Sequence, residues 1–338
     1  MKDDDRNAYI KRTETMVRPD EVAIISMFGS LLGKAPVAAQ QKVMQSSAKA
    51  NPHMGFVVEP YGLFLCHEIA DLEQAQALIP SRFRIVPTRI FEDDEPRPYV
   101  IFGAFTVHTS AMWGSRVEMY VIAEDQQTGL LSWVIVDYDT NTLSFDPGQG
   151  FVDPTADRSV VTTTHRGTVL VDMEATAPPR RIAAEAELGQ GVMTPLDQDL
   201  WLTGNLSIAY GGHLGDEQAA SFGLVFEPEE MRQALRIPLE AVDVSALSWH
   251  PGLFAPEPSV VACFPYAQHF ITSQIPTGAD IQTEEELREA VAEINASPPS
   301  KGFSSAGIKR SMAIGATISF LTTTSLLLFL ILHFVLKH

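Results

Sequence analysis

The stretch "WGSRVEMYVIAE", Trp113 to Glu124, places a charged pair inside a run that otherwise has the composition of a β-strand. Side chains alternate between the two faces of a strand, so one face carries Arg116, Glu118 and Tyr120. The opposite face carries four apolar residues: Val117, Met119, Val121 and Ala123. On a surface strand the two charges are solvated and contribute little. On a strand that lines the inside of a barrel, the same pair is a candidate binding site.

The sequence on both sides of this stretch repeats its strand-like texture. The runs rich in β-branched and aromatic residues are Phe83 to Ile90, Tyr99 to His108, Arg116 to Ala123, Leu131 to Asp137, Val160 to Thr164, Gly167 to Ala175, Leu202 to Ala209, Ser221 to Phe226 and Val242 to Trp249. Polar turns such as "EDDEPRP" and "EDQQTG" separate them. Many short strands at near-regular spacing indicate an antiparallel sheet, sandwich or barrel.

Helical patterns occupy the two ends of this β-rich region. Residues 1 to about 50 favour helix by composition, and Asp71 to Pro80 predicts a short helix that its proline ends. Near the other end, "TEEELREAVAEIN" begins with a capping box, in which Thr283 is the N-cap and Glu286 stands three residues on. We therefore expect a few helices at the periphery of the sheet.

The bulk composition limits the classes of partner. A chain of 338 residues with 45% hydrophobic residues can bury a substantial core. The formal net charge of −18 repels phosphate backbones, which argues against nucleic acid as a partner. The two cysteines, Cys66 and Cys263, make neither a disulfide scaffold nor a four-ligand zinc site.

The C-terminal run "SMAIGATISFLTTTSLLLFLILHFVL", Ser311 to Leu336, contains no formally charged residue. As a helix it would be roughly 39 Å long at about 1.5 Å per residue, enough to cross a bilayer. Lys309 and Arg310 precede it and only Lys337 follows the run closely. By the positive-inside rule, this predicts a single-pass, tail-anchored membrane protein with its bulk in the cytoplasm.

The sequence carries no motif for a cofactor or a metal. A P-loop, a dinucleotide-binding glycine pattern, a nucleophile elbow and a helical zinc pair are all missing. Asp137, Asp139 and Asn141 have the spacing of a calcium loop, but Thr142 replaces its glycine and Gly148 its glutamate. We predict neither a cofactor nor a metal site.

Three segments together resemble the acetoacetate decarboxylase-like superfamily. They are "LFLCHEIADLEQAQALIPSRFRIVPTRIF", "YVIFGAFTVHTSAMWGSRVEMYVIAEDQQTGLLSWVIVDYDTN" and "LRIPLEAVDVSALSWHPGLFA". The likeness runs from Phe56 to Ile275 and is a pattern of spacing and hydrophobicity. It implies a cone-like β-barrel that closes around a small apolar pocket.

The resemblance also implies a chemistry that this chain departs from. Decarboxylases of the superfamily form a Schiff base between a lysine and a β-keto acid, helped by glutamates and an arginine, and Glu118 falls where a pocket glutamate would. The lysine would be expected around "NTLSFDPGQG", yet none occurs between Lys49 and Lys301. Unless an N-terminal lysine folds into the barrel, imine chemistry has no amine, because arginine stays protonated. The resemblance then implies a pocket that binds rather than decarboxylates, with Arg116 offering a fork to a carboxylate.

The predicted fold class is mainly β (α+β), an acetoacetate decarboxylase-like antiparallel β-barrel with a few peripheral helices and a C-terminal transmembrane helix. The predicted divisions are an N-terminal helical or loose segment (1–55), the barrel domain (56–282), a helix (283–296), a linker (297–310) and the membrane anchor (311–336).

Three functions fit these observations. In the first, the barrel binds a small organic acid or lipid-like ligand through Arg116, Glu118, Tyr120 and His108. In the second, it is a lyase-like or hydrolytic enzyme acting on a keto-acid-like substrate without lysine imine chemistry, with Glu118 as the general acid or base. In the third, it is a scaffold or accessory subunit of a membrane complex, and a homo-oligomer is an open alternative.

Overall fold

The computed structural model describes residues 3–50, 53–109, 112–146, 150–203, 207–209, 221–273, 281, 283–298 and 324–325. The chain divides into two compact units, Met1–Ser300 and Lys301–His338. The elements described below all lie in the first unit.

Most α-helices of this unit lie near the two ends of its sequence. They are α1 (Asp3–Met16), α2 (Pro19–Leu32), α3 (Val37–Ala50), α4 (Leu72–Gln76) and α5 (Glu284–Ala296). Side-chain caps define two of their starts. The Asp71 carboxylate accepts from the Gln74 amide at 2.9 Å, and the Thr283 hydroxyl accepts from the Glu286 amide at 3.2 Å. The predicted N-cap at Thr283 is confirmed.

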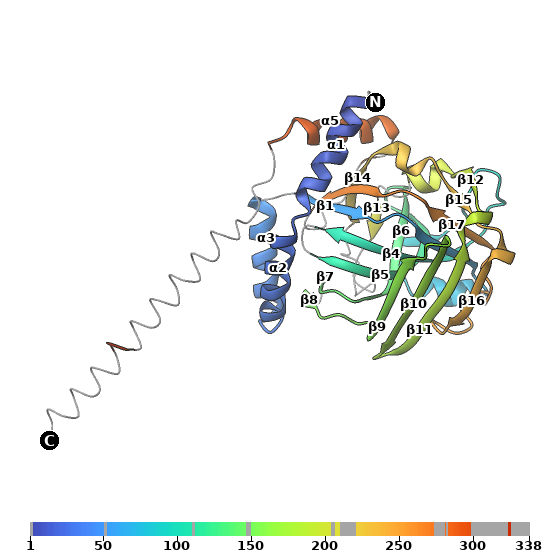
Figure 1. The fold of residues 1–338 in the computed structure, drawn as a ribbon, viewed down its shortest axis with the longest axis horizontal. Coiled ribbons are helices and arrows are strands. Elements are labelled where there is room, and N and C mark those ends of the chain that lie inside the picture. Colours follow the sequence, from blue (N-terminus) through green and yellow to red (C-terminus); the bar gives the residue numbers. More distant parts are fainter. Residues whose placement is uncertain are drawn as a thin grey trace, which may run out of the picture. The chain divides into compact units, whose positions relative to one another are not determined.

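The strands form two larger sheets and a hairpin (Figure 1). The order in the twelve-stranded sheet is β12-β15-β17-β2-β4-β1-β18-β14-β13-β6-β5-β3. Its members are β1 (His53–Val58), β2 (Gly62–Glu68), β3 (Phe83–Ile85), β4 (Tyr99–Thr109), β5 (Trp113–Asp125), β6 (Leu131–Thr140), β12 (Val192–Pro195), β13 (Ser207–Ala209), β14 (Ser221–Phe226), β15 (Gln233–Arg236), β17 (Val260–Phe264) and β18 (Gln268–Ser273). The four-stranded sheet has the order β16-β11-β10-β9, with β9 (Arg158–Thr163), β10 (Thr168–Thr176), β11 (Pro179–Glu187) and β16 (Val242–Leu247). The hairpin pairs β7 (Ser144–Asp146) with β8 (Gly150–Val152).

Strand β4 is a branch point in the larger sheet. It pairs with β5 over residues 100–108, with β2 over 99–104 and with β1 over 107–109. The sheet still ends at β12 and β3, and β13 pairs with β6 in the parallel sense. The predicted antiparallel β-barrel is therefore wrong, because a closed barrel has no terminal strands.

The predicted membrane anchor is also wrong for the part of the chain that the structure describes, where no helix is both long and apolar enough to cross a membrane. The longest helices described there, α1, α2 and α3, have 14 residues each. Such helices reach about 21 Å, short of a hydrocarbon core of about 30 Å. The predicted span, residues 311–336, lies outside the described residues except for Thr324 and Ser325.

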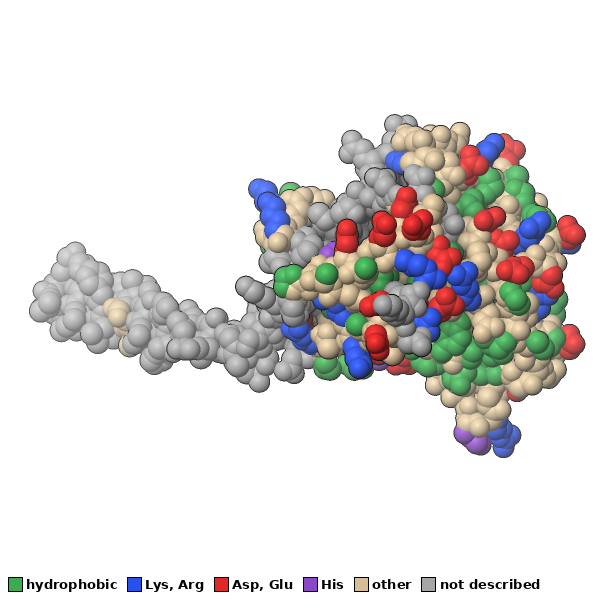
Figure 2. All heavy atoms as spheres, turned by 90° about the horizontal axis from the view of Figure 1, so that it is seen from above, with side chains coloured by type: hydrophobic (Ala, Val, Ile, Leu, Met, Phe, Trp, Pro, Cys, Tyr) green, Lys and Arg blue, Asp and Glu red, His purple; other side chains and the backbone are tan. Residues whose placement is uncertain are grey.

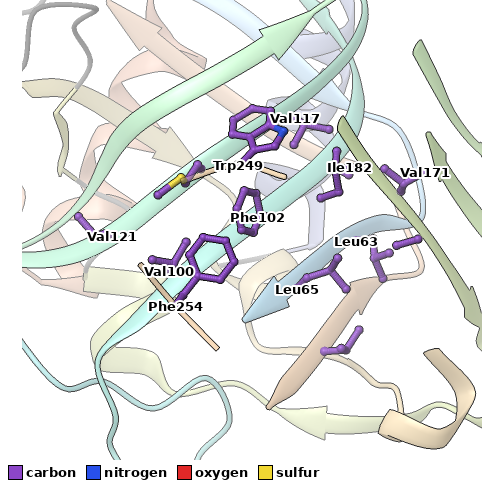
Figure 3. Packing of buried hydrophobic residues seen from close by; sticks show 14 of the residues in the cluster. Leu63, Leu65, Val100, Phe102, Val117, Val121, Val171, Ile182, Trp249 and Phe254 are labelled. Carbon is purple, nitrogen blue, oxygen red and sulfur yellow. The ribbon is translucent and has the colours of Figure 1, made fainter. Parts of the chain in front are cut away.

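Both faces of β5 are buried, each in its own apolar cluster. The predicted apolar face is confirmed, since Val117, Met119, Val121 and Ala123 all belong to the cluster between the two sheets. Figure 3 shows Val117 and Val121 of this cluster with Phe102, Trp249 and Phe254, and with Val171 and Ile182 from the smaller sheet. The other face of β5 contributes Tyr120 and Ile122 to a second cluster rich in aromatic rings.

Helix α1 packs beside α5 at one side of the larger sheet (Figure 1). Tyr9 is fully buried there, and its hydroxyl donates to the Val225 carbonyl at 2.5 Å. The Arg12 guanidinium donates to the carbonyls of Ser297 and Pro298, just past the end of α5. The first and last helices of the unit are thus joined over the same strands.

Candidate functional site

Arg116, Glu118 and Tyr120 form one connected polar group on β5. Arg116 Nε donates to Glu118 Oε1, and the Tyr120 hydroxyl donates to Glu118 Oε2. Arg116 is 5% exposed, Glu118 7% and Tyr120 6%, so the ion pair is almost completely removed from water. The alternation of a strand, together with the burial of both faces, brings these three predicted site residues together.

Two further side chains hold the Arg116 guanidinium. Its Nη1 donates to Ser144 Oγ at 3.0 Å. The ring of Tyr138 lies against its flat face, with the guanidinium carbon 4.1 Å from the ring centroid. An ion pair, a hydroxyl and an aromatic ring therefore fix the orientation of this arginine.

Ser144 is positioned by the β7–β8 hairpin and by α3. Gln40 on α3 is 2% exposed, and its side-chain oxygen accepts from the Phe151 amide at 2.7 Å. Its side-chain nitrogen donates to the Ala35 carbonyl at 2.7 Å, which ties the turn before α3 to the same point. The N-terminal helices thus support the hairpin that supplies one partner of Arg116.

Tyr138 reaches the Arg116 side of the sheet because β6 contains a bulge. Met119 pairs with Asp137 while the next residue, Tyr120, pairs with Ile135, so Val136 is an extra residue in β6. Beyond this point Tyr138 lies opposite Glu118. A bulge of this kind changes which side chains of a strand face a given side. No local pattern predicted Tyr138 or Ser144, because both positions depend on this irregularity and on the following hairpin.

Closely packed aromatic rings adjoin the polar group on one side. The ring of Tyr120 lies edge-on to that of Trp133 with centroids 5.3 Å apart, and Phe64 packs against both Trp133 and Trp201. Gly103 admits this packing, because a β-carbon there would lie 3.0 Å from Phe64 Cε1 and 3.2 Å from Tyr120 Cε2. This part of the interior is filled by side chains.

On its other side the polar group adjoins apolar residues that solvent still reaches. Phe105 pairs with Arg116 in the sheet, Phe56 pairs with Phe270, and all three phenylalanines are only partly buried. The ring of Phe270 packs on buried Phe226, which belongs to the same aromatic cluster as Tyr120. The buried ion pair therefore lies between a closed aromatic core and a more open apolar region.

His108, the fourth predicted site residue, does not join this group. On β4 it pairs with Trp113, three residues from Arg116 on β5, and so it faces the opposite side of the sheet. Its Nε2 lies 2.8 Å from Glu59 Oε1, and its ring lies 4.0 Å from that of Trp113. The structure places His108 in a separate, partly exposed contact.

A second buried polar group lies on the other face of β6, around Arg180 of β11. Arg180 donates to the carboxylates of Asp137 and Asp139 and, at 2.7 Å, to the Tyr138 carbonyl. Its guanidinium carbon lies 4.3 Å from the centroid of the Trp249 ring. Hydrogen bonds from His250 and Arg180 hold the pKa of Asp137 below its ordinary value despite the opposing effect of burial. The two aspartates with calcium-like spacing thus bind an arginine, and no group of His, Cys, Asp and Glu among the described residues could hold a metal ion.

Comparisons with known proteins show a structural likeness. No family model matches the chain, and no curated protein matches it. Among solved structures, the chain is similar to the crystal structure of acetoacetate decarboxylase from Legionella pneumophila, with 13% sequence identity and a TM-score of 0.40. The match covers 68% of this chain and 87% of that one. That neighbour carries the name of the superfamily that the sequence resembles.

Proposed function

We propose that the larger sheet binds a small, mainly apolar molecule with a carboxyl or carbonyl head group, and that Arg116, Glu118 and Tyr120 contact this head group. The observation that carries the proposal is a buried ion pair next to partly exposed phenylalanines on the same face of the sheet. The apolar body of the molecule would cover the phenylalanines. Pockets for small ligands commonly combine such apolar walls with a few polar groups.

The cost of burying charge supports a role beyond stability. Removing two ions from water costs several kcal/mol, and apolar side chains of similar volume are often at least as stable in such a place. Strongly desolvated charges with a fixed partner are enriched at functional sites. The Arg116–Glu118 pair has both properties, since each side chain is less than a tenth exposed.

Glu118 sets a condition on what can bind. It already neutralises Arg116, so a carboxylate head group would have to share or displace that contact. A neutral carbonyl or a protonated carboxyl group could be accommodated without this competition. We therefore expect removal of the Glu118 charge to strengthen the binding of a carboxylate.

The positions of the lysines support binding rather than imine chemistry. No lysine occurs between Lys49 and Lys301, and Lys34, Lys42 and Lys49 are all exposed. Lys11 on α1 is exposed as well. A Schiff base requires an amine held in a dry pocket beside the carbonyl group. The described lysines lack such a setting.

The test is the binding of octanoic acid, with octan-1-ol as the uncharged probe, to the full chain by titration calorimetry. We expect octanoate binding that Arg116→Met weakens about tenfold and Glu118→Gln strengthens by a similar factor, since one charge contact is lost or freed. Arg84→Met is the matched control. The exposed Arg84 side chain on β3 pairs with Glu124 of β5, away from the buried ion pair. The affinity of this variant should equal that of the wild type.

Three other outcomes separate the alternatives. Consumption of a third probe, the β-keto acid 3-oxooctanoate, faster than in buffer alone and lost in Glu118→Gln, would replace binding by catalysis with Glu118 as general acid or base. Binding of both probes that neither site substitution alters would place the ligand elsewhere and overturn the proposed site. No binding of either probe would overturn the proposal and leave the scaffold function as the remaining candidate.

A further inference from the structure

The β6 bulge decides which residues meet Arg116. Val136 is the extra residue between the Met119–Asp137 and Tyr120–Ile135 pairs. Beyond it Tyr138 faces the ion pair, while Asp137 and Asp139 face the smaller sheet. A shift of one residue in the pairing reverses the faces of every side chain that follows. Such a shift beyond Ile135 would turn the two carboxylates toward Glu118 and take the Tyr138 ring away from Arg116.

Arg180 contacts all three residues that follow the bulge. Its Nη1 donates to Asp137 Oδ2, its Nη2 to the Tyr138 carbonyl at 2.7 Å, and its Nε to Asp139 Oδ2 at 2.6 Å. A second bond joins Nη2 to Asp139 Oδ1 at 2.8 Å, which makes the Asp139 contact bidentate. One rigid guanidinium therefore specifies the direction of the Asp137 and Asp139 side chains and of the Tyr138 carbonyl between them.

Arg180 and Asp139 are largely buried, so their charges depend on each other rather than on water. The Arg180 side chain is 10% exposed and that of Asp139 is 2% exposed. The Trp249 ring covers the guanidinium, and His250 Nε2 lies 3.4 Å from Asp137 Oδ2. In the alternative register Arg180 would stay buried without its two counter-charges, while Asp137 and Asp139 would have to share the single Arg116 guanidinium with Glu118. Such an arrangement costs more than the native one.

We propose that Arg180 is a positioning residue that fixes the register of the β6 bulge and thereby holds the Tyr138 ring against the Arg116 guanidinium. The expected effect of Arg180 on ligand binding rests on the proposed function, whereas its expected effect on the pairing of β6 does not. The smaller sheet, through β11, then controls the geometry of the site on the far face of β6.

The chain offers a closely matched control. Arg181, the next residue of β11, is 44% exposed at its side chain and pairs with Asp172 on the surface of the smaller sheet. Arg180→Gln removes the three-residue contact, and Arg181→Gln removes an equal charge without touching β6. Arg180→Lys keeps the charge but lacks the fork, and it provides a second variant if Arg180→Gln does not fold.

The first measurement is hydrogen exchange of the β6 amides in the full chain. We expect faster exchange over residues 131–140 in the Arg180 variants than in Arg181→Gln or the wild type. Equal exchange in all of them would overturn the proposal. This result does not depend on any ligand.

The second measurement is a double-mutant cycle with octanoate as the probe. We expect Arg180→Gln to weaken octanoate binding about tenfold in the wild type but less than about twofold in Tyr138→Leu, because the ring through which it acts is then absent. An equal loss in both backgrounds would show a general structural role and overturn the positioning role. If the wild type does not bind octanoate, the proposed function fails, and hydrogen exchange alone decides the inference.

Discussion

Buried polar residues in this protein avoid an unpaired buried charge in two different ways. Arg116 and Glu118 are charged, and each satisfies the other. His67 is completely buried against the rings of Phe102 and Phe254 and remains neutral. Burial lowers the pKa of His67 to about 4, although its Nδ1 lies 2.9 Å from the Ala255 carbonyl. The free energy of unfolding should therefore respond to a substitution at Glu118 and to protonation of His67.

Breaking the buried ion pair should destabilise the protein more than removing both of its members. We expect Glu118→Gln to lower the free energy of unfolding by about 3 kcal/mol, since Arg116 would stay buried without a counter-charge. The double variant Arg116→Met/Glu118→Leu should lose less than either single variant. Urea unfolding measures all of them. A larger loss in the double variant would mean that the pair itself contributes net stability.

Acid should weaken the folded state through His67. Its pKa is lower in the folded state than the ordinary 6.5, so the stability it contributes is complete above pH 6.5 and is lost as the pH falls toward 4. The full shift corresponds to about 3 kcal/mol. The difference in unfolding free energy between neutral and acidic buffer should therefore shrink in His67→Gln and remain in His165→Gln, which alters an exposed histidine. Equal acid sensitivity in the two variants would contradict this role.

At the scale of elements, close packing between neighbouring strands fixes the surroundings of the Arg116–Glu118 pair. Gly103 on β4 lies opposite Glu118, where the rings of Phe64 and Tyr120 occupy the space that a side chain would need. The strand alternation that predicts the two faces of β5 says nothing about this contact. The predicted strand Leu202 to Ala209 likewise begins as a helical turn, Asp199–Thr203, in which buried Trp201 donates to the Ile90 carbonyl at 2.8 Å. Packing of a large ring overrides local strand preference there.

A methyl group at Gly103 should disturb the aromatic packing beside the ion pair. We expect Gly103→Ala to cost about 1–3 kcal/mol of unfolding free energy, because both rings would have to shift. Gly62→Ala is the control, since a β-carbon at Gly62 on β2 meets its nearest atom only at 3.7 Å. Thermal or urea unfolding of the two variants makes the comparison. Similar stabilities would show that the rings move aside at little cost.

At the scale of the whole molecule, the charged side chains on the face that Figure 2 shows are spread out rather than gathered in one region. Figure 2 shows acidic and basic side chains interspersed on this face, although the chain carries a net charge of −18. Local pairs such as Arg158 with Asp172 and Glu174 add little stability individually. The more consequential long-range contact is the one between α1 and the sheet, where His269 of β18 meets Glu230 and Glu14.

Docking of α1 should weaken in alkaline buffer. Burial opposes the charged form of His269, but contacts with Glu230 and Glu14 raise its pKa above 6.5. The stability from this contact is therefore complete below pH 6.5 and is lost as the pH rises through the raised folded-state pKa. Hydrogen exchange of residues 3–16 should accelerate with rising pH beyond the intrinsic chemical rate, and His269→Gln should remove that excess. Buried Tyr9 and the Arg6–Glu227 pair also hold α1, so an excess that survives in the variant would assign the effect to them.

The sequence by itself determined the mainly β character, the two faces of β5, the capped helix at Thr283 and the Arg116, Glu118 and Tyr120 group. These features depend on residues within a few positions of one another, so local periodicity and capping chemistry suffice. The tertiary structure alone decided the open ends of the sheet, the bulge in β6, the partners Tyr138 and Ser144, and the separation of His108 from the Arg116, Glu118 and Tyr120 group. Each of these depends on contacts between distant segments, as between Arg180 and residues 137–139, and no local pattern encodes which strand a segment will meet.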